Sequence, residues 1–308
     1  RLLLWLNILA AFHFIIHSWL KYTAGWPGAF SVLQGATQSD IRGWIQLLIT
    51  SLIALGLLRY VLSRGSLTSD CASQYAIVNF IIRWAFLAIM LVGIADAILA
   101  FMRVEDLRPG WLAPILTSSS KRALLIHYPL LIGSIALACF WRRTSFVWLA
   151  LLVVIAELFI VILRFIFSYE QAFMGDLVRF WYAALFLLAS AQTLFDGGHV
   201  RVDILYTLFT RRVKSLTNTF GCLAFGLPLC WVILAMGMGT RNSVLTSPLL
   251  SFEGTQSSFG LSVKYFMAGF LMLFALCMLI MFTAYCAHSI AHLRGEKTDE
   301  KAFLEGGH

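Results

Sequence analysis

Long runs of apolar residues, each bounded by a few charged residues, dominate the chain. Eight runs are long enough to cross a membrane, and they lie at 2–20, 43–62, 75–102, 123–141, 145–168, 179–195, 217–239 and 264–288. The hydrocarbon core of a bilayer is roughly 30 Å thick, so a spanning helix needs about 20 apolar residues. Backbone groups inside lipid must be hydrogen-bonded internally, and the runs are continuous rather than alternating, so helices are predicted. The predicted fold class is therefore all-α, a polytopic integral membrane protein with about eight transmembrane helices.

Two connections between these runs carry an apolar stripe at helical spacing. In 170–181 three charged residues, Glu170, Asp176 and Arg179, lie on the opposite side of the helix from the stripe. The stripe consists of Phe173, Met174, Leu177, Val178 and Trp181. Basic residues flank the stripe in 203–216, where Asp203 is placed to cap the helix by accepting backbone N–H bonds. Each segment is predicted to be a short interfacial amphipathic helix. Pro129 and Pro228 lie inside apolar runs, where kinks are expected.

Composition excludes an ordinary soluble domain. Hydrophobic residues make up 60% of the 308 residues and charged residues 12%, which is about half the charged fraction of a typical soluble domain. The net charge is +8, but Lys and Arg stand singly or in pairs at the ends of apolar runs. This placement is typical of the charge bias of membrane proteins and not of a nucleic-acid surface.

Basic residues in the connections predict the orientation of the spans. Three groups contain Arg201, Arg211, Arg212 and Lys214 in 196–216, Arg142 and Arg143 before the fifth span, and Arg294, Lys297 and Lys301 in the tail. Alternation of eight spans places these groups and both termini on one side, which should be the cytoplasmic side. The bias is weaker in the first half, because Arg103, Arg108, Lys121 and Arg122 are expected on the other side.

No cofactor or metal site is expected from the cysteines and histidines. The six cysteines show no C-x-x-C spacing, and most lie in or beside apolar runs, where a free thiol behaves as a small hydrophobe. His13 and His17 are spaced i, i+4, as are His288 and His292. Haem in a membrane anchor would need paired histidines from different helices, which is a different arrangement.

Two carboxylates, Asp96 and Glu157, lie inside predicted spans. An ionised carboxylate there costs at least ~2.5 kcal/mol on insertion scales, so each needs a partner, a water or a proton. A proton or ion relay is one interpretation. The favoured interpretation is an interhelical hydrogen bond or salt bridge that fixes helix register, with Arg83 or Arg164 as a partner.

The segment from Leu163 to Tyr206 contains L-R-F-I-F, then G-D-L-V-R-F-W-Y, an apolar run, and D-G-G-H-V-R-V-D-I-L-Y. It resembles the small (Q, or DctQ-like) subunit of tripartite ATP-independent periplasmic (TRAP) transporters. The matching positions are Arg164 with Phe165, Asp176, Gly197, His199, Arg201 and Asp203. Before the last span, E-G-T-Q-S-S-F-G is similar to the family's entry to its fourth helix, with Glu253, Ser257 and Gly260 in register. Asp176, Ala189 and Ser262 stand where the family usually has Glu, Gly and Pro.

The resemblance covers about 142–295 and implies a four-helix DctQ-like domain. Residues 1–141 would be an N-terminal membrane extension of about four spans, and 296–308 a polar cytoplasmic tail. The implied protein is a multi-pass subunit of the bacterial inner membrane and not an enzyme. Its partners would be the large membrane subunit (M), which binds sodium and substrate, the periplasmic substrate-binding protein (P) and membrane lipids. The imported solutes would be organic acids or similar small molecules.

Two other functions remain open at this point: a membrane anchor of a redox complex with haem or quinone, and a stand-alone secondary transporter. His199, Arg201 and Asp203 have no nucleophile beside them, so they are expected to position an interfacial turn against anionic lipid and not to catalyse a reaction. The outer segment 240–263, with the helix at 170–181, is expected to help dock the binding protein, through Glu253 and through Glu170, Asp176 and Arg179.

Overall fold

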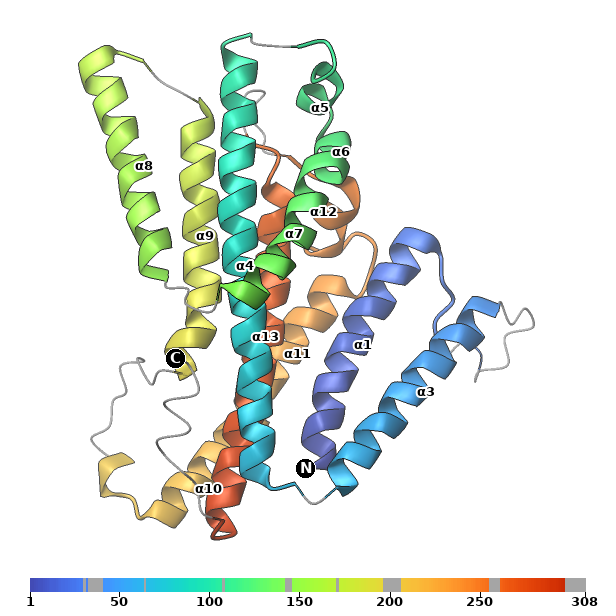
Figure 1. Cartoon of the computed structure of the whole chain (residues 1–308). Coiled ribbons are helices and arrows are strands. Elements are labelled where there is room, and N and C mark those ends of the chain that lie inside the picture. Colours follow the sequence, from blue (N-terminus) through green and yellow to red (C-terminus); the bar gives the residue numbers. More distant parts are fainter. Residues whose placement is uncertain are drawn as a thin grey trace. The chain divides into compact units, whose positions relative to one another are not determined.

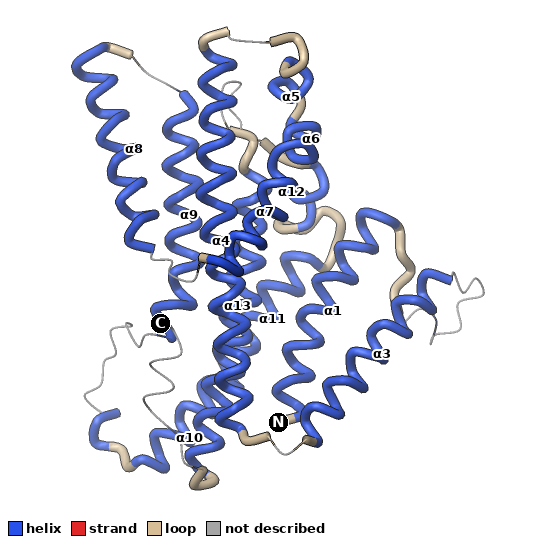
Figure 2. The backbone as a smooth tube through the Cα atoms, viewed as in Figure 1, coloured by secondary structure: helices blue, strands red, loops and turns tan. Residues whose placement is uncertain are grey.

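The computed structural model describes residues 1–29, 32, 41–63, 65–106, 109–141, 146–169, 172–195, 206–254 and 261–296. Every regular element within these ranges is a helix (Figures 1 and 2). Eight of the described helices are long and apolar enough to cross a membrane: Leu2–Ala24, Ile41–Leu62, Leu67–Val104, Ser119–Phe140, Phe146–Phe167, Phe173–Leu194, Arg211–Met238 and Lys264–Leu293. Each overlaps one predicted span, so the predicted all-α membrane fold is confirmed.

The chain divides into two compact units. The first comprises residues 1–78, 194–246 and those from 275 onward, and the second comprises 79–193 and 247–274. Each unit therefore combines residues from the first 141 with residues from the remainder of the chain. The long helix α4 (Leu67–Val104) and the last helix α13 (Lys264–Leu293) contribute residues to both units.

Polar contacts between helices organise the first unit. It contains α1 (Leu2–Ala24), α3 (Ile41–Leu62), α10 (Arg211–Gly221) and α11 (Leu227–Met238), and α1 contacts both α3 and α11. Asn7 on α1 accepts a hydrogen bond from Trp231 Nε1 at 2.8 Å and donates one to Thr283 Oγ1 at 3.2 Å. Such interhelical bonds in membranes contribute about 0.6 kcal/mol on average. Arg1 also pairs with Asp70, with Nε 2.6 Å from the carboxylate.

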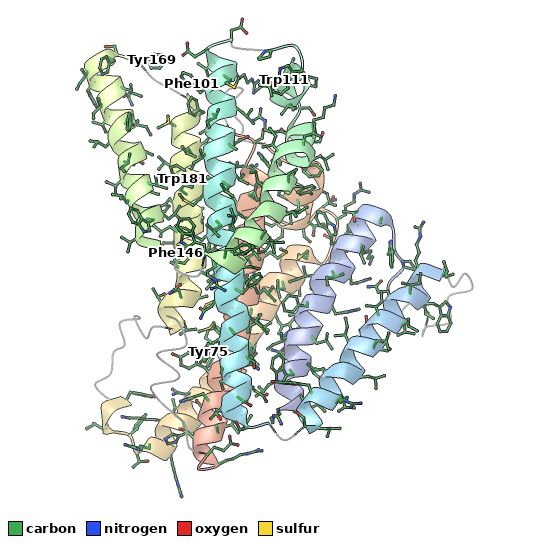
Figure 3. All side chains as sticks on the ribbon, in the orientation of Figure 1. Tyr75, Phe101, Trp111, Phe146, Tyr169 and Trp181 are labelled. Atoms are coloured by element: carbon green, nitrogen blue, oxygen red, sulfur yellow. The ribbon has the colours of Figure 1, made fainter. Side chains whose placement is uncertain are left out.

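An apolar core holds the second unit together. It contains α5 (Ala113–Thr117), α6 (Ser119–Arg122), α7 (Tyr128–Phe140), α8 (Phe146–Phe167), α9 (Ala172–Phe195) and α12 (Thr246–Ser251), with parts of α4 and α13. Phe180 and Trp181 of α9 lie in its centre with Phe270 of α13. Phe86 of α4 meets Phe146 edge to face, with 5.8 Å between the ring centres. Figure 3 shows Phe146 and Trp181 among the side chains of this unit.

Two π-helical turns stand where the prolines were predicted to kink the spans. The turn η1 (Ala123–His127) directly precedes Tyr128-Pro129, and η3 (Cys222–Gly226) directly precedes Leu227-Pro228. In η1 the Tyr128 N–H bonds to the carbonyl of Ala123, five residues back. Proline has no N–H and its ring clashes with the carbonyl four residues before it, so a wider turn ahead of it relieves the clash.

The structure corrects the two predicted amphipathic helices. Residues 172–181 are not a separate surface helix but the first turns of α9. The apolar stripe of this segment is buried in the core of the second unit and continues along α9 through Ala184 and Leu188. In the second segment, Tyr206–Leu208 form one 3₁₀ turn, and Arg211 begins the helix that runs to Met238. The first stripe therefore belongs to the span that follows it, and of the second stripe Val213 and Leu216 belong to the following span, whereas Leu208 and Phe209 precede it.

Helix α4 is longer than a bilayer requires. Its 38 residues give a length of about 57 Å at 1.5 Å per residue, whereas the hydrocarbon core is roughly 30 Å thick. The helix must therefore tilt or extend beyond the hydrocarbon, as its predicted length already implied.

Close packing of α4 on α9 depends on Gly93, and replacing it should weaken the second unit. A Cβ at Gly93 would lie 2.5 Å from Trp181 Nε1. Overpacking of this kind costs about 1–3 kcal/mol. Gly93→Leu should therefore lower the thermal unfolding temperature of the protein in detergent.

The matched control is Gly133→Leu on α7. Gly133 is also helical but has no heavy atom within 4 Å of the position of a Cβ. This variant should unfold close to the wild-type temperature. Equal unfolding temperatures for the two variants would contradict the packing described here.

Candidate functional site

A buried carboxylate, Asp96 of α4, lies at the centre of the most extensive polar network in the described part of the second unit. Its Oδ1 accepts from Arg122 Nη1 at 3.1 Å and lies 3.2 Å from His127 Nε2. Its Oδ2 accepts the backbone N–H of Ser262 at 2.7 Å. Asp96 and His127 are 0% exposed and Arg122 is 1% exposed. Three hydrogen-bonding partners, two from the span Ser119–Phe140 and one from the entry to α13, therefore converge on one carboxylate.

The other two nitrogens of Arg122 also donate hydrogen bonds. Its Nη2 donates to the carbonyl of Leu116 at 2.8 Å, and its Nε donates to the carbonyl of Ile115 at 3.3 Å. Both carbonyls belong to the short helix α5. The guanidinium therefore holds the segment that follows α4 in place and also neutralises Asp96. A buried charge is tolerated when it is paired and hydrogen-bonded, and Arg122 pairs with Asp96 and donates a hydrogen bond from each of its three nitrogens.

His127 extends the network to the last span. Its Nδ1 lies 2.7 Å from the hydroxyl of Tyr265, which is itself buried. Ser119 Oγ lies 3.2 Å from Ser262 Oγ nearby. Helices from the first 141 residues are thus bonded to the entry of α13, which belongs to the family-like part of the chain.

The π turn η1 explains how Arg122 and His127 reach the same carboxylate. In a regular α-helix, residues five positions apart point about 140° away from each other. A turn closed by a bond over five residues brings such a pair onto one face of the helix. Arg122 and His127 are five positions apart and flank this turn. The sequence prediction missed both residues, and it expected Arg122 in an outer connection.

The partner of Asp96 is Arg122 rather than Arg83 or Arg164. The Arg83 guanidinium lies 5.9 Å from the ring centre of Phe80, and its Nε is buried without a hydrogen bond among the described residues. The expectation of an interhelical salt bridge at Asp96 therefore agrees with the structure, but with a different partner. The sequence analysis gave no sign of this pairing, because it placed Arg122 in a connection outside the spans.

Glu157 has a contrasting environment. It lies in the middle of α8, where only Leu149 and Ala156 are buried, and its side chain is exposed. Within the described ranges, no hydrogen bond or ion pair reaches it. Arg164, seven residues later, is also exposed and shares this side of the helix. The structure thus brings Asp96 a partner and gives Glu157 none from this part of the chain.

The charges at the start of α9 are placed differently from their prediction. Asp176 is buried, with its side chain 9% exposed, whereas the side chain of Arg179 is 77% exposed. Their ion pair spans 3.5 Å along one helical turn, which is a weak contact for a group so open to solvent. The sequence had indicated that Asp176 and Arg179 share an exposed face. This prediction is wrong for Asp176, which is buried.

Glu253 pairs with Lys264 at the entry to α13, and both side chains are partly exposed. The carbonyl of Glu253 also accepts the backbone N–H of Tyr265 at 3.0 Å. These bonds fix the position of Glu253 beside the Asp96 network. Four of the predicted interface residues, Glu170, His199, Arg201 and Asp203, lie outside the described residues.

The histidines that raised a haem alternative have protein partners. His13 Nδ1 lies 3.1 Å from Thr50 Oγ1, and His17 Nδ1 lies 3.3 Å from Gln46 Nε2. His292 Nδ1 lies 3.3 Å from Ser215 Oγ. Each bond joins two helices, so these imidazoles contribute to packing within the first unit. No group of three potential metal ligands occurs within the described ranges.

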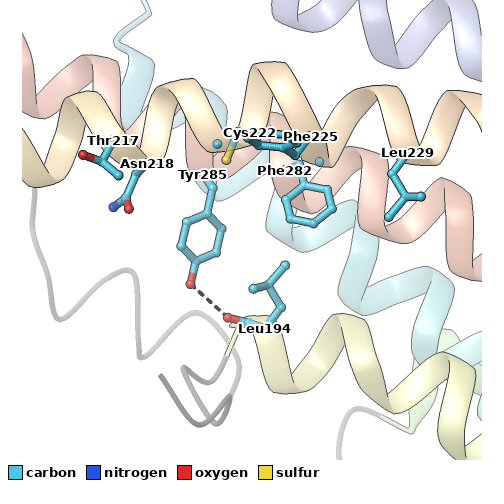
Figure 4. A pocket seen from close by; sticks show the side chains of 10 residues that line it. Leu194, Thr217, Asn218, Cys222, Phe225, Leu229, Phe282 and Tyr285 are labelled. Carbon is cyan, nitrogen blue, oxygen red and sulfur yellow. Dashed lines mark hydrogen bonds between the residues drawn. The ribbon is translucent and has the colours of Figure 1, made fainter. Parts of the chain in front are cut away.

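A cavity of about 410 Å³ lies beside the second π turn in the first unit (Figure 4). Gly221 and Gly226, five positions apart, both line it, together with Phe282 of α13. The hydroxyl of Tyr285 donates to the carbonyl of Leu194 at 2.9 Å on its wall. The lining is mainly apolar and holds no charged side chain, which is unsuited to binding an ion.

Comparison with known proteins gives one match. The model of the family described as "Tripartite ATP-independent periplasmic transporters, DctQ component" matches residues 151–290. No curated protein and no solved structure matches the chain. The matched range covers most of α8 and α13 and all of α9, α10, α11 and α12, and it agrees with the resemblance found in the sequence. Residues 151–290 therefore belong to the DctQ component family of tripartite ATP-independent periplasmic transporters.

Proposed function

We propose that this protein is the small permease subunit of a TRAP transporter and acts as a scaffold for the large membrane subunit. The observation that supports this most directly is the DctQ match over 151–290 in a chain with eight helices able to span a membrane. In this proposal the large subunit carries sodium and substrate, and a periplasmic protein delivers organic acids or similar small solutes. The protein itself resides in the bacterial inner membrane.

A static supporting role agrees with the character of the Asp96 network. The carboxylate is neutralised by Arg122 and bonded to the backbone of Ser262, so each of its oxygens already has a partner. Ion sites in secondary transporters are formed at broken helices with free backbone groups near the membrane centre. A saturated carboxylate is instead suited to fixing helix register.

The first 141 residues, on this proposal, enlarge the scaffold. Ser119, Arg122 and His127 bond to Ser262, Asp96 and Tyr265, which joins the added helices to the entry of the last span. The proposed domain division into 1–141 and 142–295 is thus a division of sequence, while packing joins both parts within each compact unit.

Docking of the binding protein remains a proposal for the segment around Glu253. The Glu253–Lys264 pair is partly exposed and can exchange partners at little desolvation cost. Arg179 offers an exposed cation in the same unit, whereas Asp176 is buried. The proposed contact therefore uses Arg179, Glu253 and Lys264 in place of Asp176.

A transport assay tests the supporting role. Proteoliposomes that contain only this chain should show no sodium-driven uptake above empty liposomes. Uptake should appear when the large subunit and the binding protein encoded by neighbouring reading frames are added. Saturable uptake by the chain alone would identify it as a transporter in its own right.

A stability measurement tests the Asp96 network. Removing one partner of a buried ion pair costs about 3–5 kcal/mol, so Asp96→Ala should strongly lower the unfolding temperature in detergent. Replacing Glu253 with Gln breaks a partly exposed pair that contributes about 0–1 kcal/mol. A loss of stability in Asp96→Ala no larger than in Glu253→Gln would contradict a structural role.

Labelling with a membrane-impermeant thiol reagent tests the proposed orientation, with both termini cytoplasmic. Of the six native cysteines, only Cys139 is exposed, and all six would be replaced before a single cysteine is introduced at position 203 or 297. The basic residues near both positions should hold them in the cytoplasm, so the reagent should react only in inverted vesicles. Ready reaction in intact spheroplasts would reverse the orientation.

A further inference from the structure

The middle of α8 presents an exposed carboxylate that makes no ion pair with the part of the chain that the structure describes. Glu157 is the twelfth of 22 residues in this helix, so it lies about 15 Å from either end at 1.5 Å per residue. The helix has the highest mean hydropathy of the eight spans, 3.0. A carboxylate exposed at that depth is costly unless it is paired.

Within the described ranges, other residues of this chain do not supply the partner. Arg164 is seven residues away, about 10 Å along the helix axis, and side chains of a helix meet only at spacings of three or four residues. Arg122 already pairs with Asp96, and Arg179 with Asp176. Among the described residues, then, Glu157 and Arg164 both remain available to a group outside the chain.

The side of α8 that carries Glu157 is exposed along its length. Val154, Glu157, Val161 and Arg164 follow each other at spacings of three and four residues, and Val154 and Val161 are 62% and 48% exposed. Residues at these spacings lie along one side of a helix, so the four form a single stripe. Leu149 and Ala156, which pack into the core of this unit, lie on a different side of α8. Figure 1 shows α8 at the edge of the unit, beside α9.

We propose that the Val154–Glu157–Val161–Arg164 stripe is the surface on which the large membrane subunit packs. The partner helix would present an Arg or Lys side chain at the depth of Glu157, and an acidic or carbonyl group nearer the membrane surface for Arg164. Charge complementarity favours this occupant over lipid, because acyl chains offer no group that neutralises a carboxylate at the membrane centre. The inference rests on the proposed function and specifies which surface of the subunit carries it out.

Co-purification of the two membrane subunits tests the surface. Glu157→Leu should reduce recovery of the large subunit about tenfold, equivalent to about 1.4 kcal/mol. The same substitution should leave the isolated chain at least as stable as wild type, because it removes an unpaired carboxylate from lipid. If Glu157 has a partner within the chain, Glu157→Leu should instead make the isolated chain less stable than wild type. That result would overturn the proposal.

A steric pair of variants provides a second, independent readout. Val161→Trp places bulk on the stripe and should reduce recovery of the large subunit. Ile155→Trp, at an exposed position about 120° further round the helix from Val161, is the matched control and should not. A photo-crosslinking amino acid at position 161, but not at 155, should form an adduct with the large subunit. Adducts with a second copy of this chain, or with lipid only, would overturn the proposal.

Failure of this surface can be distinguished from failure of the proposed function. If the wild-type chain does not co-purify with the large subunit, both the proposed function and the surface are wrong. If wild type, Glu157→Leu and Val161→Trp all co-purify equally, the function stands and the large subunit binds elsewhere.

Discussion

A carboxylate removed from both water and lipid has to be neutralised by the protein itself, and the second unit is arranged around this requirement at Asp96. Arg122 supplies the charge, and it does so only because the chain turns back after α4 and brings α6 alongside. The second carboxylate oxygen holds the Ser262 backbone, which sets where α13 begins. Helix register in a membrane has few other determinants, because an apolar side chain can contact lipid tails as favourably as it contacts another helix.

The fold was largely predictable and the network was not, for a common physical reason. Apolar runs of about 20 residues indicate spans because the bilayer imposes that length, and all eight spans were found. The same hydrophobicity cannot distinguish a lipid-facing stripe from a buried one. The stripe at Phe173, Leu177 and Trp181 was therefore interpreted as a surface helix, although it packs in the core.

Asp96 and Glu157 looked alike in the sequence and differ in the structure. One is enclosed by donors and the other stands exposed on a helix with two buried residues. The hydrophobicity of the surrounding sequence led to the same interpretation for both carboxylates, because it indicates depth in the membrane and not which side chains are adjacent. Side-chain partners depend on which helices are adjacent, and that information arises only after the chain has folded.

The π turn before Pro129 has a consequence for how related sequences are compared. Helical patterns are normally sought at spacings of three and four, and a search of that kind separates Arg122 from His127. In this chain the informative spacing is five, with a proline two positions beyond the second residue. The same spacing recurs at Gly221, Gly226 and Pro228, where the two small residues open a cavity instead of converging on a charge. In this chain, loss of one residue from the turn would restore the regular α-helical spacing and rotate Arg122 and His127 apart, even if both residues were retained.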